Sequence, residues 1–165
     1  AEFPVRSNQL GKHWTLLLAA GLLSSSLFAG EAEDLKIEDA WVRALPPTQK
    51  VTAAYLTVSN PGPAAVTMTG GKADLAAEVQ IHSTREIDGY TRMERLQQLE
   101  VPAGGSAQLE PGGTHLMLMQ LQRMPAAGEQ LNLCLTLSTG ESICTEATVK
   151  KSAASGGHDG HHQHH

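Results

Sequence analysis

The sequence predicts an all-β domain, either a sandwich or a barrel of short strands. Its 165 residues are 41% hydrophobic but only 4% aromatic, and they include 16 glycines and 8 prolines. Between Leu35 and Lys150, short apolar runs alternate with Gly- and Pro-containing turn signals at regular spacing, the pattern of successive strands. In this region no long segment has apolar residues at the spacing of a helix. We therefore expect one domain with a single core.

Nine runs of β-branched and aliphatic residues are predicted as strands. The turns between them carry Gly, Pro, Asn or Asp, which reverse the chain, and the clearest is Asp88-Gly89, a strong two-residue hairpin signal. The predicted strands are Ile37 to Ala44, Ala53 to Ser59, Val66 to Gly70, Ala77 to Ile87, Tyr90 to Leu99, Ser106 to Leu109, His115 to Leu121, Gln130 to Leu137 and Ser142 to Lys150.

The two ends of the chain differ from this domain. Residues 1–32 start like a cloning scar and continue with a positive flank, a short apolar run and small residues, the pattern of a cleaved secretory signal. The apolar run is too short and Ser-rich for a membrane span. Residues 33–150 form the predicted domain, and 151–165 are expected to be a disordered His-rich tail. The mature protein should work outside the cytoplasm.

The charge balance excludes one class of partner. Twelve Lys and Arg stand against 17 Asp and Glu, giving a formal net charge of -5, and no basic patch occurs. Binding to nucleic acid requires a basic surface, so a nucleic-acid partner is not expected.

A His and a Met are predicted to meet across the Asp88-Gly89 hairpin. A two-residue turn there makes Thr84 face Met93. His82 shares the face of Thr84 because side chains alternate with period two, so Met93 is its diagonal neighbour.

A second pair, His115 and Met117, lies on one face of a later strand. Two imidazoles and two thioethers without a carboxylate favour a soft ion, Cu(I). Taken singly, a Met is usually core filler and a His is usually hydrogen-bonded, and we assign Met68, Met119 and Met124 to that ordinary role. The metal hypothesis rests on the combination.

The spacing of these residues resembles that of the PCuAC-like periplasmic copper chaperones. His82 is followed by residues 83–92, Met93, residues 94–114 and then His115-Leu116-Met117, which matches the family motif at every interval. Further segments also resemble the family, namely 40–44, 54–56, 60–62, 101–105 and 111–118. One departure is Ser83, where many relatives have a second Met.

The resemblance implies a cupredoxin-like Greek-key β-barrel that is not an enzyme. It implies that His82, Met93, His115 and Met117 hold Cu(I) in the periplasm and deliver it toward the CuA centre of cytochrome c oxidase, directly or through a Sco-like partner. A copper sequestration or resistance protein would have the same site, and the sequence does not separate the two.

Two cysteines flank a second predicted hairpin. A loop of Ser138, Thr139 and Gly140 makes Cys134 face Cys144 in a non-hydrogen-bonded pair, with Cα atoms about 4.5 Å apart, a separation that suits a disulfide. We favour a structural bridge; a dithiol copper or thiol-disulfide redox site is the alternative. A blue-copper carrier is disfavoured because neither Cys is followed closely by a His and a Met within the domain.

The tail is a second candidate metal site. Its imidazoles suit Cu(II), and its interrupted order favours a native tail over a purification tag. The residues are His158, His161, His162, His164 and His165.

Overall fold

The structure, a computed structural model, describes residues 35–152. The predicted secretory signal and the tail histidines lie outside the described residues. The described part contains ten strands and no helix, so none of it is a helix that could cross a membrane. The strands are β1 (Lys36–Arg43), β2 (Thr52–Ser59), β3 (Val66–Ala73), β4 (Glu78–Ile87), β5 (Tyr90–Leu96), β6 (Leu99–Val101), β7 (Ser106–Leu109), β8 (Thr114–Met119), β9 (Gln130–Leu137) and β10 (Ser142–Lys150).

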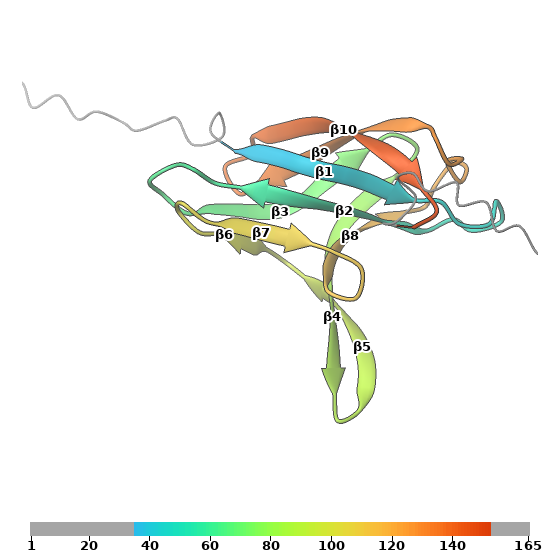
Figure 1. Ribbon diagram of the computed structural model, residues 1–165, viewed down its shortest axis with the longest axis horizontal. Coiled ribbons are helices and arrows are strands. Elements are labelled where there is room, and N and C mark those ends of the chain that lie inside the picture. The colour runs from blue at the N-terminus through green and yellow to red at the C-terminus, as the bar shows by residue number, and fades with distance from the viewer. Residues whose placement is uncertain (1–34, 153–165) are drawn as a thin grey trace, which may run out of the picture.

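The strands form one sheet that closes on itself. Along the sheet the order is β5-β4-β8-β2-β1-β10-β9-β3-β6, and an additional pairing of β4 with β3 joins the two sides into a barrel (Figure 1). The pair β1 and β10 is parallel, and the other pairs are antiparallel. The all-β prediction is therefore confirmed.

The barrel interior is an aliphatic core to which most strands contribute alternate residues. Val42, Ala54, Leu116 and Ile81 belong to it and are almost fully buried. These four occupy neighbouring positions on β1, β2, β8 and β4, so the residues before and after them point to the outer face of the sheet. That outer face carries the candidate site.

The closing pair β3 and β4 requires a glycine. Gly71 pairs with Val79 on β4 and with Leu135 on β9, so it lies where three strands meet. A Cβ at this position would collide with the carbonyl oxygen of Cys134. The barrel can therefore close this tightly only without a side chain there.

The strand predictions were close but not complete. The run from Tyr90 to Leu99 was predicted as one strand and is two: β5 ends at Leu96, and the chain then leaves β4 so that β6 pairs with β3. The strand predicted to reach Leu121 ends at Met119, because Gln120 adopts a left-handed conformation with φ of 52°.

The hairpin of β4 and β5 projects from the barrel. In Figure 1 its turn extends away from the other strands, and β5 pairs with β4 alone. Six of the seven residues of β5 are exposed. The turn has the backbone that an Asp-Gly pair favours, with φ of 54° at Asp88 and 76° at Gly89.

Candidate metal centre

His82 and His115 are direct partners across β4 and β8. The register pairs the two residues, and the centroids of their rings lie 6.1 Å apart. The rings are tilted by 41° and do not stack. Two residues 33 positions apart in sequence are thus neighbours on the outer face of the sheet.

His115 is the buried member of the pair, with 4% of its surface exposed. Its Nδ1 lies 2.9 Å from the carbonyl oxygen of Gly113, which can only accept a hydrogen bond. In the neutral ring Nδ1 therefore carries the proton, and Nε2 keeps the lone pair that a metal needs.

His82 makes its hydrogen bond with the other ring nitrogen, Nε2. Its Nε2 lies 2.9 Å from the side-chain oxygen of Gln80, while Nδ1 is buried and has no hydrogen-bond partner in the structure. Burial lowers the pKa of His82, and the charges of His115 and Arg95 lower it further. The neutral imidazole, which is the form that binds metals, is therefore favoured.

The two methionines lie on the same face as the histidines. Met117 is two residues from His115 on β8 and pairs with Gln80 of β4. Met93 pairs with Thr84, as the Asp88-Gly89 turn predicted, and so lies diagonal to His82. Met93 is 55% exposed, in contrast to His115. Ser83 alternates with His82 and faces the other way, so it does not belong to this group.

Aromatic residues of the neighbouring strands β2 and β1 lie beside His115. The rings of Tyr55 and His115 have centroids 6.3 Å apart, and those of Trp41 and Tyr55 lie 4.5 Å apart. The guanidinium of Arg43 lies over both Trp41 and Tyr55. A bulge in β1 at Asp39, where φ is 53°, adjusts the register so that Trp41 pairs with Tyr55.

The sequence reasoning missed three residues around His82. Gln80 and Glu78 precede it by two and four positions on the same face, and Arg95 is its partner on β5. The side-chain nitrogen of Gln80 lies 2.6 Å from Glu78, and Arg95 lies 3.7 Å from the same carboxylate oxygen. The period of two and the predicted hairpin register would have been sufficient to find them.

Within residues 35–152, no group of three or more His, Cys, Asp or Glu side chains is placed to hold a metal ion. A metal held by His82 and His115 would therefore need other donors. The thioethers of Met93 and Met117 lie on the same face of the strands.

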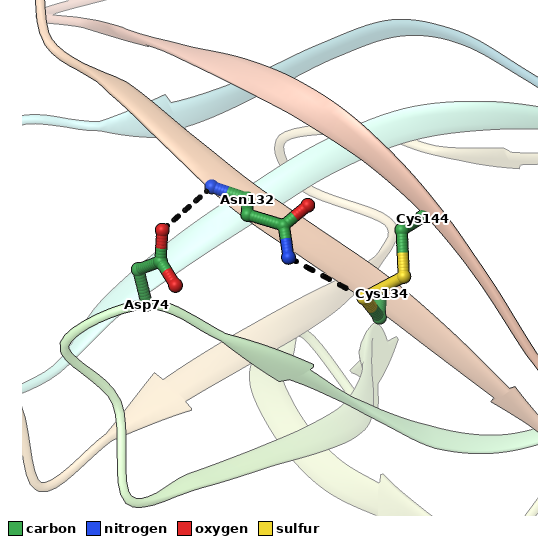
Figure 2. The surroundings of a disulfide bond; sticks show 4 residues. All are labelled: Asp74, Asn132, Cys134 and Cys144. Carbon is green, nitrogen blue, oxygen red and sulfur yellow. Dashed lines mark hydrogen bonds between the residues drawn. A yellow bond between two sulfur atoms is a disulfide. The ribbon is translucent and has the colours of Figure 1, made fainter.

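The two cysteines are joined by a disulfide between β9 and β10. Their Cα atoms are 4.0 Å apart, and the register pairs them directly, as predicted (Figure 2). The side-chain nitrogen of Asn132 lies 3.7 Å from the sulfur of Cys134, and its backbone nitrogen donates to Asp74. The bridge lies on strands that carry none of the four candidate ligands, so the cysteines do not complete the histidine site.

Residues 35–149 match the model of the LpqE-like family, a family named for lipoproteins. The chain belongs to the LpqE-like family. It is 31% identical over 121 residues to the lipoprotein Lxx21020 of Leifsonia xyli subsp. xyli (strain CTCB07), covering 73% of this chain and 72% of that protein.

Solved structures relate this LpqE-like chain to PCuAC domains, as the sequence motif predicted. The solution structure of the Cu(I) form of DR1885 from Deinococcus radiodurans has 31% identity and a TM-score of 0.60, over 79% of this chain and 87% of that one. The copper-bound PCuAC domain from PmoF2 has 23% identity and a TM-score of 0.60, over 72% and 94% of the two chains. The fold is thus the cupredoxin-like β fold of these domains.

Proposed function

We propose that this protein is a copper chaperone that holds Cu(I) with His82, Met93, His115 and Met117. The observation that supports this most strongly is the arrangement of the two histidines, which face each other from adjacent strands with a buried Nδ1 of His82 left unpartnered. The relative from Deinococcus radiodurans, whose solved form contains Cu(I), adds support. A set of two imidazoles and two thioethers is uncharged and soft, which suits Cu(I) better than hard cations.

The exposure of the ligands suggests how copper is passed on. His115 is buried, whereas Met93 lies exposed on the projecting hairpin. An incoming ligand from a partner protein would reach the copper beside Met93 and replace this thioether first. Because thioethers need not be protonated or deprotonated, exchange at this position requires no proton transfer.

Substitution of both methionines tests the ligand assignment. Changing Met93 and Met117 together to Leu should abolish Cu(I) binding in a competition titration, because the two imidazoles remain without thioether partners. The fold should persist, since neither side chain belongs to the aliphatic core. Met124→Leu, the same change at a buried site outside the candidate centre, is the control and should bind Cu(I) normally. Retention of wild-type affinity by the double variant would refute the assignment.

We propose that the tail supplies a second site, for Cu(II). The supporting observation is its imidazole content, which favours Cu(II) over Cu(I). A tethered second site would raise the effective copper concentration near the barrel. Deleting residues 156–165 should remove one class of Cu(II) sites while Cu(I) binding by the barrel is unchanged, and an unchanged Cu(II) stoichiometry would exclude the tail site.

We also propose that delivery occurs outside the cytoplasm, toward the CuA subunit of cytochrome c oxidase or a Sco-like copper protein, without catalysis. Membership of a family named for lipoproteins supports this location. Mixing the Cu(I)-loaded protein with an apo CuA domain, and separately with a Sco-like protein, should move copper to at least one of them. Retention of copper against both acceptors would favour sequestration instead.

A further inference from the structure

We propose that Gln80 is a positioning residue that fixes the tautomer of His82 and thereby presents Nδ1, not Nε2, to Cu(I). This inference rests on the proposed function and extends it to the choice of donor atom. The evidence is a chain of side-chain hydrogen bonds along one face of β4, from Glu78 through Gln80 to His82.

Glu78 determines which groups donate and which accept in this series of hydrogen bonds. A carboxylate can only accept hydrogen bonds, and Glu78 has Arg95 beside it as a counter-charge at 3.7 Å. The atom of Gln80 that lies 2.6 Å from Glu78 must therefore be the amide nitrogen, which donates. The amide oxygen of Gln80 is then the atom directed at His82.

The tautomer of His82 follows from this polarity. An amide oxygen accepts and cannot donate, so the His82 nitrogen 2.9 Å away, Nε2, must carry the proton. In the neutral ring the lone pair then belongs to Nδ1. This atom is the one that is buried without a partner, a state that is costly unless a ligand eventually uses it.

The position of Gln80 connects this chain to the other ligands. Gln80 pairs with Met117, and His82 pairs with His115, so Gln80 occupies the fourth corner of a square of residues on β4 and β8. His115 is oriented by a backbone carbonyl instead, which leaves its Nε2 free. The site would therefore present Nδ1 from one histidine and Nε2 from the other. Hydrogen-bonded partners of this kind commonly affect metal affinity by about 10- to 100-fold.

The test compares two variants of the full mature chain. Gln80→Glu, made together with Glu78→Gln so that position 78 supplies the donor between the two side chains, keeps an acceptor oxygen facing His82, whereas Gln80→Leu removes it. Long-range proton–nitrogen NMR correlations on the copper-free protein at neutral pH report the tautomer of each histidine. We expect a protonated Nε2 on His82 in the wild type and in the double variant, and a mixture of tautomers in Gln80→Leu. His115 should keep its protonated Nδ1 in all three proteins, which provides an internal control.

Cu(I) competition titrations complete the test. Gln80→Leu should bind Cu(I) about tenfold more weakly or worse, and the double variant should remain closer to the wild type. The inference is overturned if wild-type His82 carries its proton on Nδ1, or if Gln80→Leu retains both the tautomer and the affinity of the wild type. It is also overturned if both variants lose affinity equally with an unchanged tautomer, since that indicates only a packing role. Failure of the wild type to bind Cu(I) would overturn the proposed function. The NMR spectra of the copper-free protein would still show whether Gln80 fixes the tautomer of His82, so the two failures can be told apart.

Discussion

His82 and His115 face each other across one pair of strands, yet they are oriented by different kinds of partner. A backbone carbonyl holds His115, and this partner cannot be removed by substitution of a side chain. A side-chain amide holds His82, and that amide depends in turn on Glu78. In each case the partner is the residue two positions before the histidine, Gly113 for His115 and Gln80 for His82. The affinity of the site should consequently be more sensitive to changes on β4 than on the loop before β8.

Gly71 is a single position on which barrel closure depends. Gly71→Ala should lower the free energy of unfolding by about 2 to 3 kcal/mol, because its new Cβ meets the Cys134 carbonyl and forces the strands apart. Urea denaturation measures this change. Gly113→Ala, where a Cβ makes only ordinary contacts, should change the free energy of unfolding by about 1 kcal/mol or less and is the control. Equal stability of the two variants would contradict the role of Gly71.

Among the structural elements, the β4–β5 hairpin is the one whose geometry the site depends on most. It carries His82 near its base and Met93 on its outer strand, and its distal part packs against no other strand. The turn alone fixes the register that places Met93 diagonal to His82. A slip of one residue would turn Met93 to the opposite face.

Strain introduced at the turn should therefore weaken copper binding more than stability. Gly89→Val places a β-branched residue at φ of 76° and should cost about 1 to 2 kcal/mol locally. Because β5 is exposed, we expect faster amide exchange along the hairpin and weaker Cu(I) binding, with little change in the midpoint of thermal unfolding. Gly140→Val, at φ of 91° in the hairpin of β9 and β10, is the matched control. If both variants bind Cu(I) equally well, the hairpin register does not matter for the site.

The molecule as a whole separates its stabilising cross-link from its candidate metal site. The disulfide joins β9 and β10, and β3 lies between β9 and β4 along the closed sheet. The four proposed ligands are on β4, β5 and β8. The cross-link therefore stabilises one part of the barrel, while the hairpin that carries Met93 stays exposed elsewhere.

Removal of the disulfide should affect stability and leave copper binding unchanged. Substitution of both Cys134 and Cys144 by Ala should lower the free energy of unfolding by about 3 kcal/mol, the entropic value for a loop of this size. Chemical denaturation measures the stability, and a Cu(I) titration of the folded variant measures the site. Loss of Cu(I) binding in the folded variant would instead support the alternative in which the cysteines form a redox or copper site.

Local sequence signals were sufficient to predict how several residues of the candidate site are placed relative to one another. The Asp88-Gly89 turn fixed the partner of Met93, and the loop ending at Gly140 fixed the pairing of the cysteines, because tight turns determine register over the few residues that follow. His115 and Met117 were grouped for a different local reason, because side chains two residues apart on a strand share a face. The conformations of these segments depend on residues that are close in the chain, so the register of each hairpin and the face of each side chain can be predicted from a single sequence.

The all-β class, the hairpin registers and the two His-Met pairs thus follow from local patterns in the sequence. The three-dimensional structure was needed to show that the two pairs lie side by side, because the pairing of β4 with β8 joins residues separated by three intervening strands and depends on the closure of the barrel. It also revealed that the run after Tyr90 splits into two strands, and that Gln80 lies 2.9 Å from Nε2 of His82 while Nδ1 has no hydrogen-bond partner. Those features depend on packing between distant segments, which local periodicity does not encode.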